Sequence, residues 1–161
     1  LMLKQEYKEL FPNVTNAGRN AANVVDACEF IAELIETGEW KPEFTTAAQT
    51  ERGIYHAPCH LRAQGIGKTG FHLLKMIPQF EVTDADAGCC GISGSYGFKK
   101  DKYNIAMAVG NKLFTTIDES DAQYALTECG TCQVQIKHGI DKSKGHKVLH
   151  PISMLRQRVK I

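Results

Sequence analysis

The spacing of hydrophobic positions changes near residue 51, and this change predicts two kinds of structure. Over residues 20–37, apolar side chains recur every three or four positions, as on one face of an amphipathic helix. These positions are Val24, Ala27, Cys28, Ile31, Leu34 and Ile35. Residues 1–10 are also rich in helix-forming side chains and stop shortly before Pro12. We therefore expect residues 1–50 to form a helical segment that ends in a polar connection.

From residue 51 onward, short apolar runs alternate with helical patterns. The expected strands are residues 53–56, 80–83, 123–127 and 147–149. The expected helices are residues 69–77, 102–117, 131–138 and 152–159. Strand–helix alternation repeated four times predicts an α/β fold, with a mostly parallel sheet of about four strands flanked by helices. Residues 51–161 are expected to form this second part of the chain.

Composition excludes several classes of protein and leaves the cysteines to be explained. A chain of 161 residues can bury a conventional core, so its six cysteines are not needed as disulfide staples. The 19 Lys and Arg against 18 Asp and Glu give a net charge of +1, which predicts no nucleic-acid partner. No apolar run approaches the roughly 18 residues of a membrane span, and no signal peptide opens the chain. We expect a cytoplasmic protein, in which disulfides are disfavoured.

Five of the six cysteines follow predicted strands at their carboxyl ends. Cys59 follows the first strand, Cys89 and Cys90 follow the second, and Cys129 and Cys132 follow the third. The carboxyl ends of parallel strands share one edge of the sheet, where ligands bind in open α/β folds. The five sulfurs are therefore expected to converge in one crevice.

The spacing of these cysteines suits thiolate ligation. Cys129 and Cys132 lie three residues apart at an expected helix start, where the helix dipole stabilises thiolate and lowers the cysteine pKa. The side chains of Cys89 and Cys90 diverge in an extended segment, which favours two metal atoms over one. Cys28 lies on the helical stripe and is expected to be a packing residue. The five remaining cysteines therefore favour a site with more than one metal atom.

Two other uses of the cysteines stay open. Four of them could close a structural zinc site in a docking module, or they could form a catalytic thiol–disulfide site. His60 and His150 are candidate ligands or hydrogen-bond donors, although a structural role is expected for both. His56 and Pro58 are expected to shape the turn that presents Cys59.

The cysteine pattern resembles the CCG cysteine-rich domain found in heterodisulfide reductases and in iron–sulfur subunits that serve glycolate, lactate and glycerol-3-phosphate oxidation. The pattern is Cys59…Cys89-Cys90-Gly91…Cys129-x-x-Cys132. Three stretches are more closely similar to the iron–sulfur subunit family of anaerobic glycerol-3-phosphate dehydrogenases. They are YHAPCH at 55–60, CCGISGSYGFKK at 89–100 and HPI at 150–152.

The resemblance implies an organisation, a ligand set and a function. It implies that residues 51–161 are one CCG domain and that residues 1–50 are the tail of a preceding copy with its connection. The implied ligands of a 4Fe–4S cluster, of cubane or non-cubane type, are Cys59, Cys89, Cys90, Cys129 and Cys132. The implied function is non-catalytic electron transfer in anaerobic respiration on glycerol-3-phosphate, from a flavin-containing dehydrogenase subunit toward quinone. The complex would hold the domain at the inner face of the cell membrane.

Overall fold

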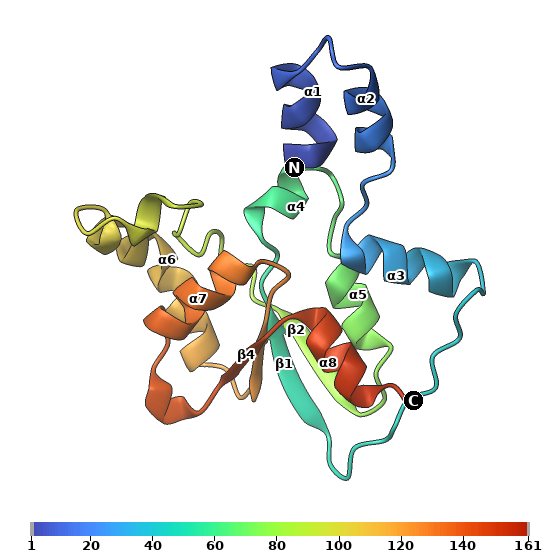
Figure 1. Ribbon diagram of the computed structural model, residues 1–161. Coiled ribbons are helices and arrows are strands. Elements are labelled where there is room, and N and C mark those ends of the chain that lie inside the picture. The colour runs from blue at the N-terminus through green and yellow to red at the C-terminus, as the bar shows by residue number, and fades with distance from the viewer. Residues whose placement is uncertain (1, 161) are drawn as a thin grey trace.

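The computed structural model of the protein describes residues 2–160, and its centre is a four-stranded parallel sheet (Figure 1). The strands are β1 (Glu51–Tyr55), β2 (Phe80–Asp84), β3 (Tyr124–Leu126) and β4 (Lys147–Leu149). Their order across the sheet is β2-β1-β3-β4, and every neighbouring pair is parallel. Gly53 in β1 is paired with Val82 on one side and with Tyr124 on the other. The predicted α/β fold with a parallel sheet is confirmed.

Helices cover both faces of the sheet (Figure 1). One face carries α6 (Tyr103–Asp118) and α7 (Gly130–Gly139), and the other carries α5 (Thr69–Lys75) and α8 (Pro151–Arg158). The shorter helices are α4 (Cys59–Ala63), η2 (Tyr96–Phe98) and η3 (Lys142–Lys144).

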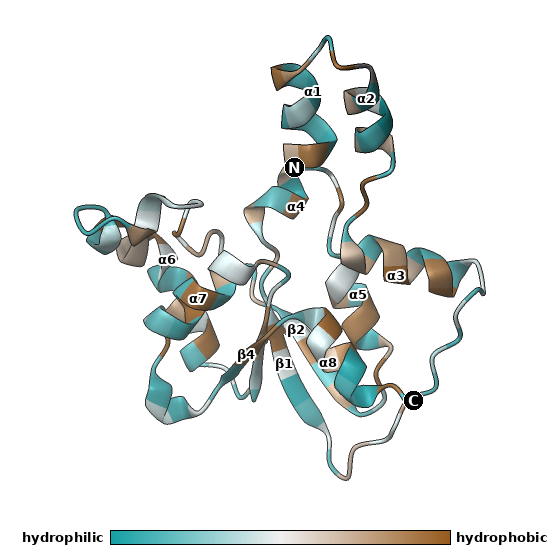
Figure 2. Cartoon of the chain, in the orientation of Figure 1, coloured by the Kyte–Doolittle hydropathy of each residue, from teal (hydrophilic) through white to brown (hydrophobic). Residues whose placement is uncertain are grey.

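The two faces have separate hydrophobic cores, because successive residues of a strand point to opposite sides. Ile54 and Ala125 belong to the core under α6 and α7, whereas Tyr55 and Leu126 belong to the core under α5 and α8. All three residues of β3 are buried, as is usual for parallel strands covered on both faces, and hydropathy colouring shows apolar residues among the strands and helices (Figure 2). Cys90 and Cys132 are part of the first core.

The N-terminal segment is helical, but its main helix is interrupted. It consists of η1 (Met2–Glu6), α1 (Tyr7–Leu10), α2 (Thr15–Ala22) and α3 (Ala27–Glu36). The prediction of one helix over residues 20–37 is wrong, because Asp26 caps a new helix. Its side chain accepts a hydrogen bond from the Cys28 backbone N–H, and the Glu29 side chain accepts one from the Asp26 N–H. The hairpin of η1, α1 and α2 stands away from the sheet, while α3 packs against α5 (Figure 1).

Gly91, which follows the cysteine pair, lies directly on α6. Its φ of +87° is in the left-handed region, and a Cβ atom there would lie 2.0 Å from the Ala106 carbonyl oxygen and 2.9 Å from the Gly110 nitrogen. Both of these are backbone atoms of a long helix, so neither can move away cheaply. The loop that carries the cysteine pair can therefore lie directly against α6 only because Gly91 has no side chain.

Replacing Gly91 with alanine is expected to lower the free energy of unfolding by about 2–5 kcal/mol, because backbone strain and a steric clash add together. The matched control is Gly88→Ala, since Gly88 also has a positive φ, +83°, but its Cβ would have no atom within 4 Å. That control should lose only the strain, about 1–2 kcal/mol. Urea unfolding of both variants measures the difference. Equal losses would show that the close approach to α6 is wrong.

Candidate functional site

The segments that follow all four strands meet at one edge of the sheet. Cys59 is the first residue of α4 after β1, Cys129 is the N-cap of α7 after β3, and His150 is the N-cap of α8 after β4. The loop after β2 carries Cys89 and Cys90. Because β1 connects forward to β2 on one side and pairs with β3 on the other, this edge contains the switch point at which open α/β sheets bind ligands.

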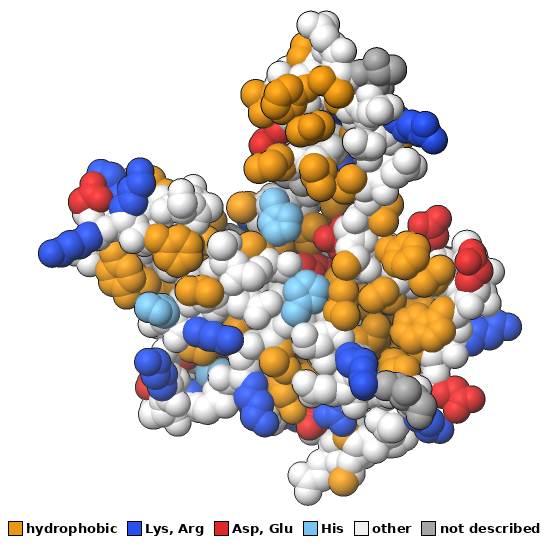
Figure 3. All heavy atoms as spheres, in the orientation of Figure 1, with side chains coloured by type: hydrophobic (Ala, Val, Ile, Leu, Met, Phe, Trp, Pro, Cys, Tyr) orange, Lys and Arg blue, Asp and Glu red, His pale blue; other side chains and the backbone are white. Residues whose placement is uncertain are grey.

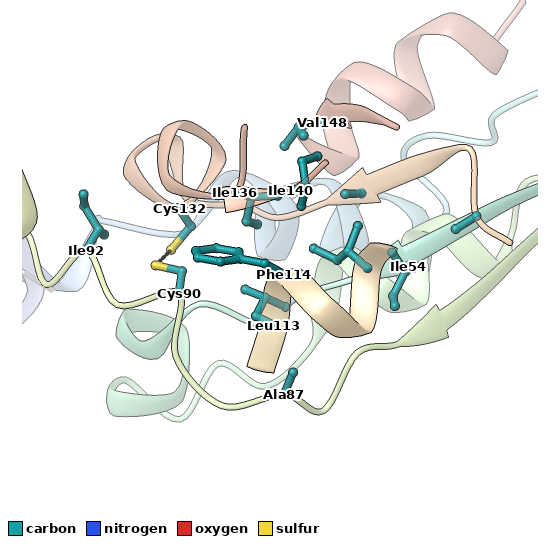
Figure 4. Close-up of a cluster of buried hydrophobic side chains, with 13 residues drawn as sticks. Ile54, Ala87, Cys90, Ile92, Leu113, Phe114, Cys132, Ile136, Ile140 and Val148 are labelled. Atoms are coloured by element: carbon teal, nitrogen blue, oxygen red, sulfur yellow. Dashed lines mark hydrogen bonds between the residues drawn. The ribbon is translucent and has the colours of Figure 1, made fainter. Parts of the chain in front are cut away.

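A pair of buried sulfur atoms forms the centre of the site. Cys90 and Cys132 are 2% and 3% exposed, and their Sγ atoms share a hydrogen bond of 3.1 Å (Figure 4). The Phe114 ring lies beside them in the same core. All six cysteines are free thiols. The His56 side chain joins this pair, since one ligand atom from each of the three residues lies within 4.8 Å of the others.

Two further sulfurs, partly exposed, accept hydrogen bonds from backbone N–H groups. The Cys129 Sγ accepts from the Cys132 N–H at 3.5 Å and lies 3.0 Å from the Thr131 hydroxyl. The Cys89 Sγ accepts from the Gly91 N–H at 3.3 Å. N–H groups at the start of a helix or in a tight turn stabilise negative charge, so both positions suit thiolate.

Cys59 lies at the rim of the site and is exposed. Partial burial raises the pKa of its thiol, and the charges of Cys89, Cys90 and Cys129 raise it further. These interactions place the Cys59 sulfur within electrostatic reach of the other segments.

Hydrogen bonding separates the pKa values of the inner thiols. The hydrogen bond with Cys132 lowers the pKa of Cys90 to about 5, and a hydrogen bond with His56 acts in the same direction. The hydrogen bond with Cys132 lowers the pKa of Cys129 to about 4, helped by Thr131. The pKa of Cys132 is raised, because this thiol shares its proton with both neighbours and is buried. These interactions favour the thiolate form of Cys90 and Cys129, and thiolates are the form that binds metal.

His56 was assigned only to a turn by the sequence, yet its ring is buried in the site. It is 4% exposed and belongs to the group with Cys90 and Cys132. The strand pattern contains a signal for this position: Ile54 faces the core of the two cysteines, and a residue two positions later points the same way. His150 has a structural role, since its Nδ1 accepts a hydrogen bond of 3.1 Å from the Ile152 N–H.

Cys28 lies outside the site, fully buried on α3, as the sequence predicts for a packing residue. Burial, followed by the charge of Glu128, raises the pKa of its thiol. Glu128 is a buried carboxylate that sequence reasoning missed. Its oxygens accept hydrogen bonds from the Tyr55 hydroxyl at 2.6 Å and from the Gly70 N–H at 2.7 Å. This network ties β3 to β1 and α5, one residue before Cys129.

The parallel sheet and the cysteines at its edge define a cysteine-rich domain of the CCG type. The chain matches the CCG cysteine-rich domain over residues 54–137, and it belongs to this family. It is 36% identical over 155 residues to one subunit of the anaerobic glycerol-3-phosphate dehydrogenase of Escherichia coli (strain K12), a match that covers 96% of this chain and 37% of that relative. The chain thus spans little more than a third of that relative's length.

Two relatives from methanogenic archaea are also similar. One is a subunit of the fumarate reductase (CoM/CoB) of Methanothermobacter marburgensis, 34% identical over 123 residues, 74% of this chain and 24% of the relative. The other, named as an iron–sulfur protein of Methanocaldococcus jannaschii, is 35% identical over 94 residues, 58% of this chain and 19% of the relative. No solved structure matches the chain. Within residues 2–160, no helix has the length and apolar character needed to span a bilayer.

Proposed function

We propose that this chain is an iron–sulfur electron-transfer domain of an anaerobic glycerol-3-phosphate dehydrogenase complex. It would relay electrons from a flavin-containing subunit toward quinone, at the inner face of the cell membrane. The observation that carries the proposal is the convergence of cysteine thiols, two of them with strongly lowered pKa, at one edge of a parallel sheet. The similarity to the glycerol-3-phosphate dehydrogenase relative of Escherichia coli supports the particular complex.

The residues at the site fit an iron–sulfur cluster by their chemistry. Two thiolates bound to one tetrahedral metal, each about 2.3 Å from it, lie roughly 3.8 Å apart. The Cys90–Cys132 separation of 3.1 Å is shorter than this value, so the two sulfurs would move apart to bind one metal, within a group whose ligand atoms spread over no more than 4.8 Å. The proposed ligands are Cys59, Cys89, Cys90, Cys129 and Cys132.

The chain would contribute ligands, a dry environment and hydrogen bonds. A bound cluster supplies one-electron oxidation and reduction, with a potential set by hydrogen bonds to sulfur and by solvent exposure. The burial of Cys90 and Cys132 keeps water from one side of the site. The N–H groups of Gly91 and Cys132 donate to sulfur on the more exposed side. Oxidation of glycerol-3-phosphate itself would belong to the flavin-containing partner.

We also propose a division of the chain. Residues 51–161 would form one CCG domain, and residues 1–50 would be the tail of a preceding copy with its connection. The separate position of the hairpin of η1, α1 and α2 supports a unit that precedes the sheet, whereas α3 packs against α5 (Figure 1).

Protein prepared without oxygen is expected to be brown and to contain iron and acid-labile sulfide in a fixed ratio. The physical reason is that the thiolates are preorganised by the fold, so the metal does not have to order them. Metal and sulfide analysis with an absorption spectrum measures this. Colourless protein that holds only stoichiometric zinc would replace the proposal with a zinc-stabilised docking module.

A thiol–disulfide catalyst is the second candidate function. It is favoured by the direct Cys90–Cys132 contact and by the lowered pKa of Cys90, which are features of reactive dithiols. Metal-free protein that turned over a disulfide substrate, and lost this activity in Cys90→Ser, would favour the second candidate.

A further inference from the structure

The ring of His56 is held in a fixed place at the end of β1. Its backbone N–H donates a hydrogen bond of 2.8 Å to the Leu126 carbonyl oxygen, which extends the β1–β3 ladder by one residue. The side chain is 4% exposed and lies on the face of the strand that Ile54 occupies. A buried imidazole at the end of a strand has a fixed position, so it can hold a neighbouring side chain in place.

The ring lies close to two of the buried sulfurs. One ring nitrogen lies within 4.8 Å of the Cys90 and Cys132 sulfurs, and the interaction with His56 lowers the pKa of Cys90. A cysteine sulfur bound to a cluster only accepts hydrogen bonds, and a neutral imidazole carries a single N–H. The N–H would therefore point to Cys90, and the other nitrogen would act as an acceptor.

His56 also lies beside a small polar pocket. His56 lines a pocket of about 80 Å³ together with Arg62, Lys68, Asp84 and Asp86. This volume holds several water molecules. His56 thus belongs both to the group with the buried sulfurs and to the lining of a polar pocket.

We propose that His56 is a positioning residue of the sulfur site, whose imidazole N–H binds the Cys90 sulfur and stabilises the reduced state of the centre. The inference rests on the proposed iron–sulfur function. Five cysteines already exceed the four ligands of a cubane, so no ligand position requires the histidine. Reduction adds negative charge to the cluster and its thiolates, so a donor at sulfur stabilises the reduced form more than the oxidised form. Loss of the donor should lower the potential.

The test is a redox titration followed by electron paramagnetic resonance, on the full chain prepared without oxygen. His56→Phe fills most of the volume without a donor, and it is expected to lower the ratio of reduced to oxidised centre about tenfold at the wild-type midpoint. That change is a downward shift of about 59 mV for a one-electron couple. His56→Gln can still donate and should recover most of the shift. The control His138→Phe makes the same substitution at an exposed position in the last turn of α7 and should leave the midpoint unchanged.

The outcomes distinguish a failure of the proposed His56 role from a failure of the proposed iron–sulfur function. An unchanged midpoint and spectrum in a loaded His56→Phe protein would overturn the role of His56, as would equal shifts in the Phe and Gln variants. If His56→Phe and His56→Leu hold no cluster while His56→Gln is loaded with a near-wild-type spectrum, the donor role is supported. If the Gln variant fails with them, the donor role is overturned. Wild-type protein without iron would instead overturn the proposed function.

Discussion

Replacing Cys90 with serine is expected to remove the cluster from the protein. Cys90 is buried, shares a hydrogen bond with Cys132 and lies within 4.8 Å of a His56 ring nitrogen, so its sulfur has the central position among the proposed ligands. Loss of a residue that only supports a ligand typically weakens metal binding about 10–100-fold, and loss of the ligand itself should exceed this. Iron and acid-labile sulfide should therefore fall by more than about tenfold in anaerobic preparations.

Two matched variants make this result specific. Cys28→Ala removes a thiol that is equally buried but lies on α3, away from the site, and it should keep the iron content of the wild type. Cys59→Ser removes the exposed thiol at the rim and leaves four cysteines, which should still hold a cluster with an altered spectrum. Wild-type iron content in Cys90→Ser would exclude Cys90 as a ligand.

Replacing Phe114 with alanine is expected to lower the free energy of unfolding by about 3–5 kcal/mol, since it leaves a cavity in the core beneath the site. The ring is 3% exposed and fills the space between α6 and α7. Cβ atoms at Gly110 and Gly139 would lie 2.4 Å and 2.3 Å from the ring, so the ring packs directly against both glycines. Neither glycine has a side chain that could fill the cavity. Because Cys90 and Cys132 belong to the same core, the variant should also release iron faster to a chelator (Figure 4).

Phe98→Ala is the control for this prediction. Phe98 is 59% exposed and lies among the surface hydrophobic side chains, some of which are visible over η2 and α6 (Figure 3). Its removal should change the free energy of unfolding by no more than about 0.5 kcal/mol. Urea unfolding and the rate of iron release measure both effects. A loss below about 1 kcal/mol in Phe114→Ala would show that the ring does not support the site.

The sequence predicts the α/β domain well because its strands are short apolar runs and its helices are long or clearly delimited. The expected helix at residues 102–117 corresponds to α6, Tyr103–Asp118. The sequence does not predict α4, Cys59–Ala63, because five residues are too few to show a helical period. It also fails between α2 and α3, where the hydrophobic stripe continues across a capping box formed by Asp26 and Glu29.

The sequence also predicts one part of the candidate site and misses another. The positions of the five cysteines after strands lead to one edge of the sheet, because parallel topology alone brings those loops together. The role of Glu128 depends on a hydroxyl from β1 and an N–H from α5, which are 73 and 58 residues away in the chain. No local pattern encodes such partners. His56 falls between these cases, since strand alternation gives its direction but not its contact with Cys90.

The opposite edge of the sheet carries exposed lysines through which the protein could be attached to a surface. The turn η3, Lys142–Lys144, precedes β4 and so lies at the amino edge, and both of its lysines are exposed. Protein coupled to an electrode through this turn would stand with its sulfur edge toward the solution. Coupling through Lys99 and Lys100, which follow the cysteine loop, would turn the sulfur edge toward the electrode. The two orientations would allow voltammetry to compare electron exchange through opposite ends of the same domain.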